Sequence, residues 1–452
     1  MGDTFQIERL GPAKIDSPLD LGTEPGDMIV DFTPDDARII SEIEWNKIER
    51  RLRAGESLPT LEIAGPRKKI YFDPSKLKVG IVTCGGICPG LNTVIRSLVM
   101  TLCHGYGVRS VYGFRYGFAG LVPREGHPVD ELTPEFVRNI HTAGGTVLGT
   151  SRGPQDPEVM VDTLERMSVQ LLFAIGGDGT FRGTQKIHEE VARRGAKIGV
   201  IGIPKTIDND IPLVDQTFGF DTAVGLAADA ISAAYAEARS TVNGIGLVKL
   251  MGRQSGFIAA NAALAMRNVN LVLIPELPFD LEGENGLYAY LEDRFAQKKF
   301  TVIVVAEGAG QQHLQSAGGT AASGNAALGD IGLFLKQKIL ERFERRAKIS
   351  LKYIDPSYMI RSAPPCSTDS IFCGYLAQAA VHAGLSGRTG MAVGRSHGRF
   401  THIPLAELVD ARKLVDPEGD MWRSVLESTG QPFYLSNTPP KSPARLSFPP
   451  HV

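Results

Sequence analysis

The densest group of reactive side chains in the sequence lies in the segment GIPKTIDNDIP, residues 202–212. It offers a cation, Lys205, a hydroxyl, Thr206, and two carboxylates, Asp208 and Asp210, directly after an apolar run that favours a β-strand. Phosphoryl transfer to an alcohol needs this set. A cation and a hydroxyl hold phosphoryl oxygens, one carboxylate accepts the alcohol proton, and another acts near a metal ion. Alternation along an extended loop would place the two carboxylates on one side. The alternative is an Asx-type turn, in which these side chains hydrogen-bond their own backbone.

A second group of candidate residues follows another apolar run, in the segment LLFAIGGDGTFRG, residues 171–183. The run favours a buried strand, and the GGDGT sequence would lead from it into a helix. Glycines leave room for a polyphosphate, and the carboxylate of Asp178 is the kind of oxygen ligand that Mg²⁺ prefers. Alternatively, Asp178 only caps the helix. The segment TCGGICPGLN, residues 83–92, has the same form and is a weaker candidate for phosphate binding.

Three further segments place polar side chains where a strand is expected to end. Arg253 in LVKLMGRQSGF could clamp a phosphate with both arms of its guanidinium. Glu307 in TVIVVAEGAG could accept hydrogen bonds from sugar hydroxyls. Tyr358 and Arg361 in YIDPSYMIRSAPP are three residues apart, so one helical turn could present both. Taken singly, each is more often part of a surface turn or a structural ion pair. Asp221 in FGFDTAVGL is expected to be the N-cap of an alanine-rich helix, with a structural role.

The elements that must position these residues show the rhythm of an α/β protein. Short β-branched runs alternate with helical stretches, which predicts a mainly parallel sheet covered by helices on both faces. Ligands of open α/β sheets bind beyond the carboxyl ends of the strands, so the shared position of these residues favours function. Strands are expected at residues 77–83, 169–177, 196–204, 245–252, 270–276 and 301–308, and helices at 134–144 and 184–195.

The two ends of the chain lack this rhythm. Residues 1–75 are interpreted as an extension packed onto the main body, with a short amphipathic helix indicated by Ile43, Ile48 and Leu52. Residues 315–329 are small, polar and rich in glycine, which predicts a flexible surface loop. The proline-rich C-terminal tail is expected to be extended and to lie on a neighbouring subunit.

Composition and charge exclude several classes of function. The 452 residues suit two or three domains, with 43% apolar and 22% charged residues, as in soluble globular proteins. The formal net charge of −2 offers nothing that attracts nucleic acid or an anionic membrane. No apolar run is long enough to span a membrane, and the charged start of the chain lacks the apolar stretch of a signal peptide, so a cytoplasmic protein is expected. The five cysteines form no CxxC pair and the nine histidines no ligand spacing, which favours reduced structural thiols over a zinc site.

Taken together, these segments resemble the phosphofructokinase family. The resemblance spans residues 78–403 and depends on the ordered motifs TCGGICPGLN, TSRG, GGDGT, PKTIDND, FGFDTA, MGRQSG, AEGAG and YIDPSYMIR. The sequences of these motifs, especially PKTIDND and YIDPSYMIR, are similar to those of the longer branch of the family in plants, protists and some bacteria. The resemblance implies a 6-phosphofructokinase, which moves a phosphoryl group from Mg-ATP to the 1-hydroxyl of fructose 6-phosphate in glycolysis.

The resemblance also implies a role for each matching residue. Asp208 would be the base that accepts the proton of the sugar 1-hydroxyl, and Asp178 would lie at Mg²⁺. ATP would be bound by Gly85, Arg152, Gly153, Gly177, Asp178, Gly179 and Thr180. Fructose 6-phosphate would be bound by Thr206, Ile207, Asp208, Met251, Gly252, Arg253, Glu307, Tyr358, Met359, Ile360 and Arg361, with Tyr358 and Arg361 at the 6-phosphate.

In this family the fold has two similar α/β domains with the active site in the cleft between them. Applied to this chain, the resemblance implies an N-terminal extension (1–75), a nucleotide-binding domain (76–212 with 388–418), a sugar-phosphate-binding domain (213–387 with 419–435) and a proline-rich tail (436–452). It also implies a homotetramer or a homodimer, because the family often completes the 6-phosphate site across a subunit interface.

The identity of the phosphoryl donor depends on two positions that point in different directions. Lys205 is typical of the pyrophosphate-using branch, but that branch tends to carry aspartate where this chain has Gly179. We predict ATP, because a carboxylate at position 179 would collide with the α-phosphate, whereas Lys205 need not exclude ATP. A non-catalytic regulatory member of the family should have lost Asp178, Asp208 or Asp210, which are all present. NAD kinase and diacylglycerol kinase-like enzymes share GGDGT, but they are not expected to carry PKTIDND, MGRQSG and YMIR in this order.

Overall fold

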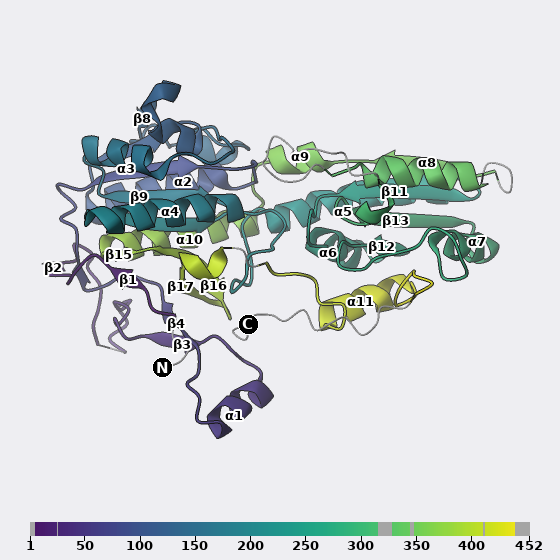
Figure 1. Ribbon diagram of the computed structural model, residues 1–452, viewed down its shortest axis with the longest axis horizontal. Coiled ribbons are helices and arrows are strands. Elements are labelled where there is room, and N and C mark those ends of the chain that lie inside the picture. Colours follow the sequence, from purple (N-terminus) through teal and green to yellow (C-terminus); the bar gives the residue numbers. More distant parts are fainter. Residues whose placement is uncertain (1–4, 25, 315–327, 344–347, 410–411, 439–452) are drawn as a thin grey trace.

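The computed structural model describes residues 5–24, 26–314, 328–343, 348–409 and 412–438. Two α/β bodies lie end to end along the long axis of the molecule, each built on a sheet with helices on both faces (Figure 1). The expected fold class is therefore confirmed. The loop expected at residues 315–329 and the tail expected at 436–452 lie largely outside the described residues.

The first body contains a nine-stranded sheet with a parallel centre. The order across the sheet is β3-β4-β17-β16-β10-β9-β6-β7-β8, in which β16, β10, β9, β6 and β7 are parallel and the outer strands antiparallel. The strands are β3 (Arg38–Ile40), β4 (Thr60–Ile63), β6 (Lys78–Thr83), β7 (Ser110–Phe114), β8 (Val129–Glu131), β9 (Leu171–Gly176), β10 (Gly199–Pro204), β16 (Met391–Ser396) and β17 (Arg399–Pro404).

Both faces of this sheet are buried, which is why its central strands are continuous apolar runs. On β6, Val79 and Ile81 join the core formed with α2 (Leu91–Met100) and α10 (Ser367–Leu385). Val82 belongs to the core on the other side, which contains α3 (Pro157–Arg166) and α4 (Asp178–Arg194). The sequence analysis assigned α10 to the second domain, but this helix packs against α2 and β10 of the first body.

The second body contains a smaller, fully parallel sheet with the order β12-β13-β11-β14. Its strands are β11 (Gly244–Leu250), β12 (Leu271–Leu273), β13 (Phe300–Ala306) and β14 (Ser350–Ile354). One face packs on α5 (Phe220–Arg239) and α6 (Phe257–Met266), and the other on α7 (Leu287–Gln297) and α8 (Ile331–Phe343). The short α9 (Ser357–Ser362) lies between the two bodies in Figure 1, and α11 (Asp420–Thr429) packs on α6.

The expected secondary structure is right for the strands and wrong for one helix. All six expected strands are present, as β6, β9, β10, β11, β12 and β13, and the helix expected at 184–195 is the later part of α4. The helix expected at 134–144 is instead a series of turns with a short 3₁₀ segment at Ile140–Thr142. Carbonyl oxygens of this segment accept from side chains of α2 instead: Asn92 donates to that of Ala143 and Arg96 to that of Arg138. A β-carbon on Gly144 would lie 1.8 Å from the carbonyl oxygen of Ser362, so the segment is pressed against the end of α9.

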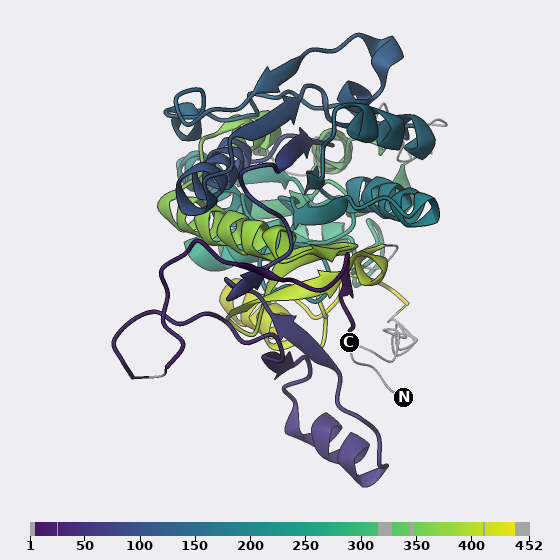
Figure 2. The same cartoon turned by 90° about the vertical axis from the view of Figure 1, so that its left-hand side faces the viewer.

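The N-terminal extension is more than a segment packed on the surface. Its strands β3 and β4 extend the nine-stranded sheet, while β1 (Glu8–Arg9) pairs with β15 (Arg388–Thr389) and β2 (Ile15–Asp16) with β5 (Lys69–Ile70). The expected helix is present as α1 (Trp45–Arg53), but it projects away from the body, as Figures 1 and 2 show. Ile43 and Leu52, two of the residues that indicated this helix, are exposed.

Helices that cross a membrane must be both long and apolar. None of those that the structure describes meets both requirements.

Candidate functional site

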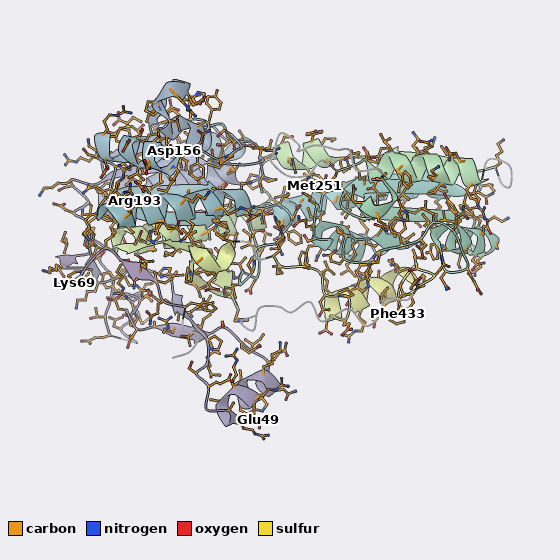
Figure 3. All side chains as sticks on the ribbon, viewed as in Figure 1. Glu49, Lys69, Asp156, Arg193, Met251 and Phe433 are labelled. Carbon is orange, nitrogen blue, oxygen red and sulfur yellow. The ribbon has the colours of Figure 1, made fainter. Side chains whose placement is uncertain are left out.

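The site lies where the carboxyl ends of the two parallel sheets meet. The first sheet contributes the turns after β6, β9 and β10, and the second sheet contributes the turns after β11 and β13. Met251, directly after β11, lies at the junction of the two bodies in Figure 3. Asp208 makes two of the contacts between the halves: the hydroxyl of Ser255 donates to its carbonyl oxygen at 3.4 Å, and the backbone N–H of Arg253 donates to its carboxylate.

Asp208 is the most perturbed carboxylate of this junction. Burial and the negative charges of Asp210 and Glu307 together raise the pKa of Asp208 to about 7, against the opposing effect of Arg361. Its Oδ1 atom is buried and has no hydrogen-bond partner among the described residues. A carboxylate with a pKa near neutrality and one open acceptor position is suited to take a proton from an alcohol.

The loop that carries Asp208 is not extended, as the sequence analysis expected, but bent. Asn209 has a positive φ of 55°, and the side chain of Thr206 receives the backbone N–H of Asp208 at 3.2 Å. The same hydroxyl donates to Asp210 Oδ1 at 2.9 Å, and Asn209 Oδ1 receives the backbone N–H of Thr217 at 3.0 Å. The loop is therefore a turn. The side chain that hydrogen-bonds its backbone is Thr206, and Asp208 lies close enough to Asp210 for the charge of Asp210 to raise its pKa.

Three cationic side chains gather over the glycine turn that follows β6. Lys205 Nζ donates to the carbonyl oxygen of Gly86 at 2.7 Å and lies 3.7 Å from the place of a β-carbon on Gly85. A β-carbon on Gly86 would lie 3.3 Å from Arg152 and 3.8 Å from Arg361. Burial lowers the pKa of Lys205, and both arginines lower it further. Positive groups around a bare backbone turn form a site for phosphoryl oxygens.

The GGDGT segment presents Asp178 at the start of α4. The N-cap of this helix is Gly177, so the alternative in which Asp178 only caps the helix is wrong. Asp178 Oδ2 accepts from Arg182 and from Arg412, each at 2.7 Å. A β-carbon at Gly179 would have no atom within 4 Å, which leaves open space beside the first turn.

Asp178 fits the requirements of a magnesium ligand. Its Oδ1 atom is buried without a hydrogen-bond partner in the described part of the chain, and a hard cation prefers such an oxygen. The described residues contain no group of three or more His, Cys, Asp or Glu side chains placed to hold a metal ion. That arrangement agrees with the habit of Mg²⁺, which is usually held by one or two carboxylates together with substrate phosphates and water.

The turns after β11 and β13 form the part of the site that belongs to the second body, and close backbone contacts hold these two turns together. Gly252 has a φ of 125°, and the backbone N–H of Gly308 donates to its carbonyl oxygen at 3.1 Å. A β-carbon on Gly308 would lie 1.9 Å from the carbonyl oxygen of Arg253, so the turns after β11 and β13 touch at this glycine. Glu307 is thereby held near Asp208, whose pKa it raises.

The structure separates the candidates on α9. Tyr358 and Met359 are 86% and 75% exposed, whereas Ile360 is fully buried and anchors the helix. Arg361 reaches the cations over Gly86. Tyr358 and Arg361 were expected on one helical turn, which is confirmed, but within one chain only Arg361 reaches this cation cluster.

The remaining candidates lie close to these groups, and the ATP candidates Arg152, Gly153 and Gly179 are exposed, while Thr180 is buried. The Gly85 turn is tied to the TSRG segment, because Thr150 donates to the Gly85 carbonyl oxygen at 2.6 Å. Asp221, expected as an N-cap, lies in the first turn of α5 after the N-cap Gly219 and accepts from Gln216 at 2.8 Å. Its structural role stands, but its expected position was wrong.

Sequence reasoning missed Arg412. This residue follows the first body in the chain, yet its guanidinium reaches both Asp178 and Asp210. Its segment, DARKLVDPEG, has no motif that marks a ligand, so only the tertiary structure reveals the contact. Arg182 carried a better signal, because it stands four residues after Asp178 on one helix face.

The chain is similar in sequence to known proteins. Residues 78–384 match the sequence profile of a family described as Phosphofructokinase. The chain is 46% identical over 447 residues to the ATP-dependent 6-phosphofructokinase of Borreliella burgdorferi, with 96% of this chain and 98% of that protein covered. It is 49% identical over 372 residues to the ATP-dependent 6-phosphofructokinase of Trypanosoma cruzi, with 81% and 76% covered.

Solved structures share the fold at lower identity. A pyrophosphate-dependent phosphofructokinase from Marinobacter aquaeolei is similar with a TM-score of 0.64 at 20% identity, covering 78% of this chain and 91% of that one. The Pichia pastoris phosphofructokinase in the T-state gives a TM-score of 0.62 at 21% identity, covering 78% of this chain and 37% of that one. At these identities the similarity concerns the fold alone.

Proposed function

Because the chain belongs to the phosphofructokinase family, we propose that it phosphorylates the 1-hydroxyl of fructose 6-phosphate with ATP, as a step of glycolysis. The observation that carries this proposal is Asp208, a buried carboxylate with a pKa of about 7 at the meeting point of the two sheets. The names of the relatives support the substrate and the donor.

Asp208 accepts the proton of the sugar hydroxyl as that oxygen attacks the terminal phosphoryl group. Its raised pKa lets it take the proton near neutral pH, and its buried Oδ1 offers the acceptor atom. Lys205, Arg152 and Arg361 surround the glycine turn. Lys205 and Arg152 stabilise the charge on the transferred phosphoryl oxygens, and Arg361 binds the phosphate of the sugar. Asp178 would hold Mg²⁺, which supplies further charge neutralisation for the phosphates.

The two bodies contribute different residues to the site and would bind different substrates. In this proposal the first body, with the GGDGT segment and the Gly85 turn, binds the nucleotide. The second body, with Gly252, Arg253 and Glu307, binds the sugar phosphate, and Ile207 and Met251 pack beneath the site as buried residues.

The second candidate is a pyrophosphate-dependent enzyme, and Lys205 favours it. The ammonium of Lys205 lies at the phosphate turn, where it could serve pyrophosphate as well as ATP. Gly179 favours ATP, because its open surroundings leave room for the rest of the nucleotide. The names of the ATP-dependent relatives also favour ATP as the donor.

The proposal extends to the assembly and its location. Tyr358 and Met359 on α9 and Ile371 and Tyr375 on α10 are exposed apolar side chains, which supports a homotetramer or a homodimer. Sedimentation analysis of the purified chain tests this, and a monomer at micromolar concentration would refute it. The five cysteines are free thiols, which supports a reducing compartment such as the cytoplasm.

A steady-state assay tests the function. Purified protein receives fructose 6-phosphate and Mg²⁺ with either ATP or pyrophosphate, and formation of fructose 1,6-bisphosphate is measured. We expect turnover with ATP to exceed turnover with pyrophosphate. Faster turnover with pyrophosphate would select the second candidate, and no turnover with either donor would reject both.

A further inference from the structure

A single guanidinium bridges two aspartates that follow different strands of the first sheet. Arg412 donates through one nitrogen to Asp178 Oδ2 at 2.7 Å and through the other to Asp210 Oδ2 at 2.9 Å. Asp178 follows β9, Asp210 follows β10, and Arg412 comes from the segment that leads to α11. The bridge therefore joins three parts of the chain at the phosphoryl-transfer site.

Hydrogen bonds hold the backbone that follows Arg412 against both bodies. The next residue, Lys413, donates its backbone N–H to the carbonyl oxygen of Asp210 at 2.9 Å and its ammonium to that of Val214 at 3.0 Å. Val415 is buried, and its N–H donates to Glu276 at 2.8 Å.

The bridged carboxylates are shielded from water to different degrees. The exposed fractions of the side chains are 22% for Asp178, 10% for Asp210 and 32% for Arg412. Opposite charges in such a place interact more strongly than on an open surface. Arg182 also pairs with Asp178, so two guanidinium groups face the carboxylates before any metal or nucleotide arrives.

We propose that Arg412 is a positioning residue that keeps Asp178 and Asp210 charge-compensated in the free enzyme, so that a divalent cation binds well only together with the nucleotide. This inference rests on the proposed function, in which Asp178 is the magnesium ligand. A divalent ion that approaches the empty site is repelled by the guanidinium, and the phosphates of the nucleotide supply the negative charge that offsets this repulsion.

Binding of Mn²⁺ to the full chain without nucleotide, followed by electron paramagnetic resonance, tests the proposal. The wild type should bind weakly at the site. Arg412→Gln removes the positive charge and should tighten Mn²⁺ binding by about tenfold or more. Arg412→Lys keeps the charge and should bind Mn²⁺ as the wild type does. Arg182→Gln is the matched control, because it removes a cation from Asp178 and leaves the bridge in place; its effect should be smaller.

Two results would overturn the proposal. One is a folded Arg412→Gln protein that binds Mn²⁺ no better than the wild type. The other is equal tightening in Arg182→Gln or in Arg412→Lys, which would remove the special role of the bridging charge. Arg412→Met supplies the same neutral test if the glutamine variant does not fold. These results are independent of the donor assay on the wild type, so failure of the inference is distinguishable from failure of the proposed function.

Discussion

Asp208 and Asp210 are two residues apart but lie in different surroundings. Asp210 receives the hydroxyl of Thr206 and the guanidinium of Arg412, so its charge is compensated. Asp208 has a buried oxygen with no partner among the described residues, and its pKa is raised to about 7. The difference between the two environments supports the proposal that Asp208 is the base, and that Asp210 instead neighbours the proposed metal ligand Asp178 through Arg412.

Replacing Asp208 should remove the proton acceptor and little else. We expect Asp208→Asn to lower kcat by about 10²–10⁴, the usual contribution of a positioned general base. The KM for fructose 6-phosphate should change little, because the loss belongs to the transition state. Asp221→Asn, which alters a carboxylate bonded to Gln216 near the start of α5, serves as the control and should keep its turnover. Near-normal turnover of a folded Asp208→Asn protein would refute the assignment.

The raised pKa of Asp208 also predicts a pH dependence. A protonated carboxylic acid cannot accept the hydroxyl proton, so kcat/KM for fructose 6-phosphate should fall as the pH drops through about 7. Arg361 opposes the rise of this pKa, so Arg361→Ala should move the acid limb to higher pH. The same variant should raise the KM for fructose 6-phosphate about 10- to 150-fold, the effect of losing about 1.5–3 kcal/mol of charge-assisted hydrogen bonding. If the acid limb does not move in Arg361→Ala, then Arg361 does not influence the pKa of Asp208.

In the proposed function, the preference for ATP over pyrophosphate depends on Gly179. Aspartate there would add a negative charge beside the α-phosphate, with a repulsion of about 4 kcal/mol at 4 Å before screening. Even a third of this would reduce kcat/KM for ATP by about tenfold. Pyrophosphate should suffer less, because it has no adenosine that must pass this point. The control Gly179→Ala adds a β-carbon to open space and should change either donor little. Equal losses for both donors in Gly179→Asp would contradict this reasoning.

At the scale of elements, the site is built by turns that touch each other at glycines. The turns after β11 and β13 meet where Gly308 lies against the carbonyl oxygen of Arg253. The N–H of Arg253 in turn donates to the carboxylate of Asp208. A change at this contact therefore passes to the carboxylate of Asp208 through the backbone of Arg253.

We expect Gly308→Ala to lower kcat/KM for fructose 6-phosphate by about tenfold or more, because the new β-carbon would lie 1.9 Å from a backbone oxygen and must push the two turns apart. Gly374→Ala on α10 is the matched control. Its β-carbon would have no atom within 4 Å, and alanine is favoured over glycine in a helix by about 1 kcal/mol. Kinetics and thermal melting of both variants give the comparison, and an active Gly308→Ala would show that the turns can separate freely.

At the scale of the whole molecule, the N-terminal extension is joined to the sheet by a buried ionic cluster. Arg388, which is 1% exposed, pairs with Glu62 of β4 and donates to Asp35 at 2.9 Å. Arg67 donates to Glu62 at 3.1 Å, and His402 also contacts it. Burial alone would raise the pKa of Glu62, but His402 and Arg388 lower it to about 2. The stability linked to this group is present above its ordinary pKa of 4.5 and is lost as the pH falls toward 2.

Removing Arg388 should loosen the extension from the body. We expect Arg388→Ala to reduce the free energy of unfolding by about 3 kcal/mol, the lower end for a broken buried pair, because Arg67 still faces Glu62. Arg423→Ala is the control, since its pairs with Asp420 and Glu427 are exposed and should contribute less than about 1 kcal/mol. Urea denaturation measures both, and equal effects would show that the cluster does not stabilise the fold.

Six strands, and the reactive side chains at their ends, could be predicted from the amino-acid sequence alone. Apolar runs such as that of β9 are local patterns, and parallel strands that end in glycines and carboxylates must place these groups at one edge of a sheet. Asp178, Lys205 and Asp208 could therefore be named without a structure. Each lies where the sequence indicated, directly after its strand.

Only the tertiary structure decided how these groups act on one another. The pKa of Asp208 depends on burial and on Glu307, which comes from another sheet. Arg361 and Arg412 reach the site from segments far away in the sequence. The physical reason is the same in each case. Electrostatic interactions depend on distances between residues and on the exclusion of water, and both are fixed by the packing of the two bodies.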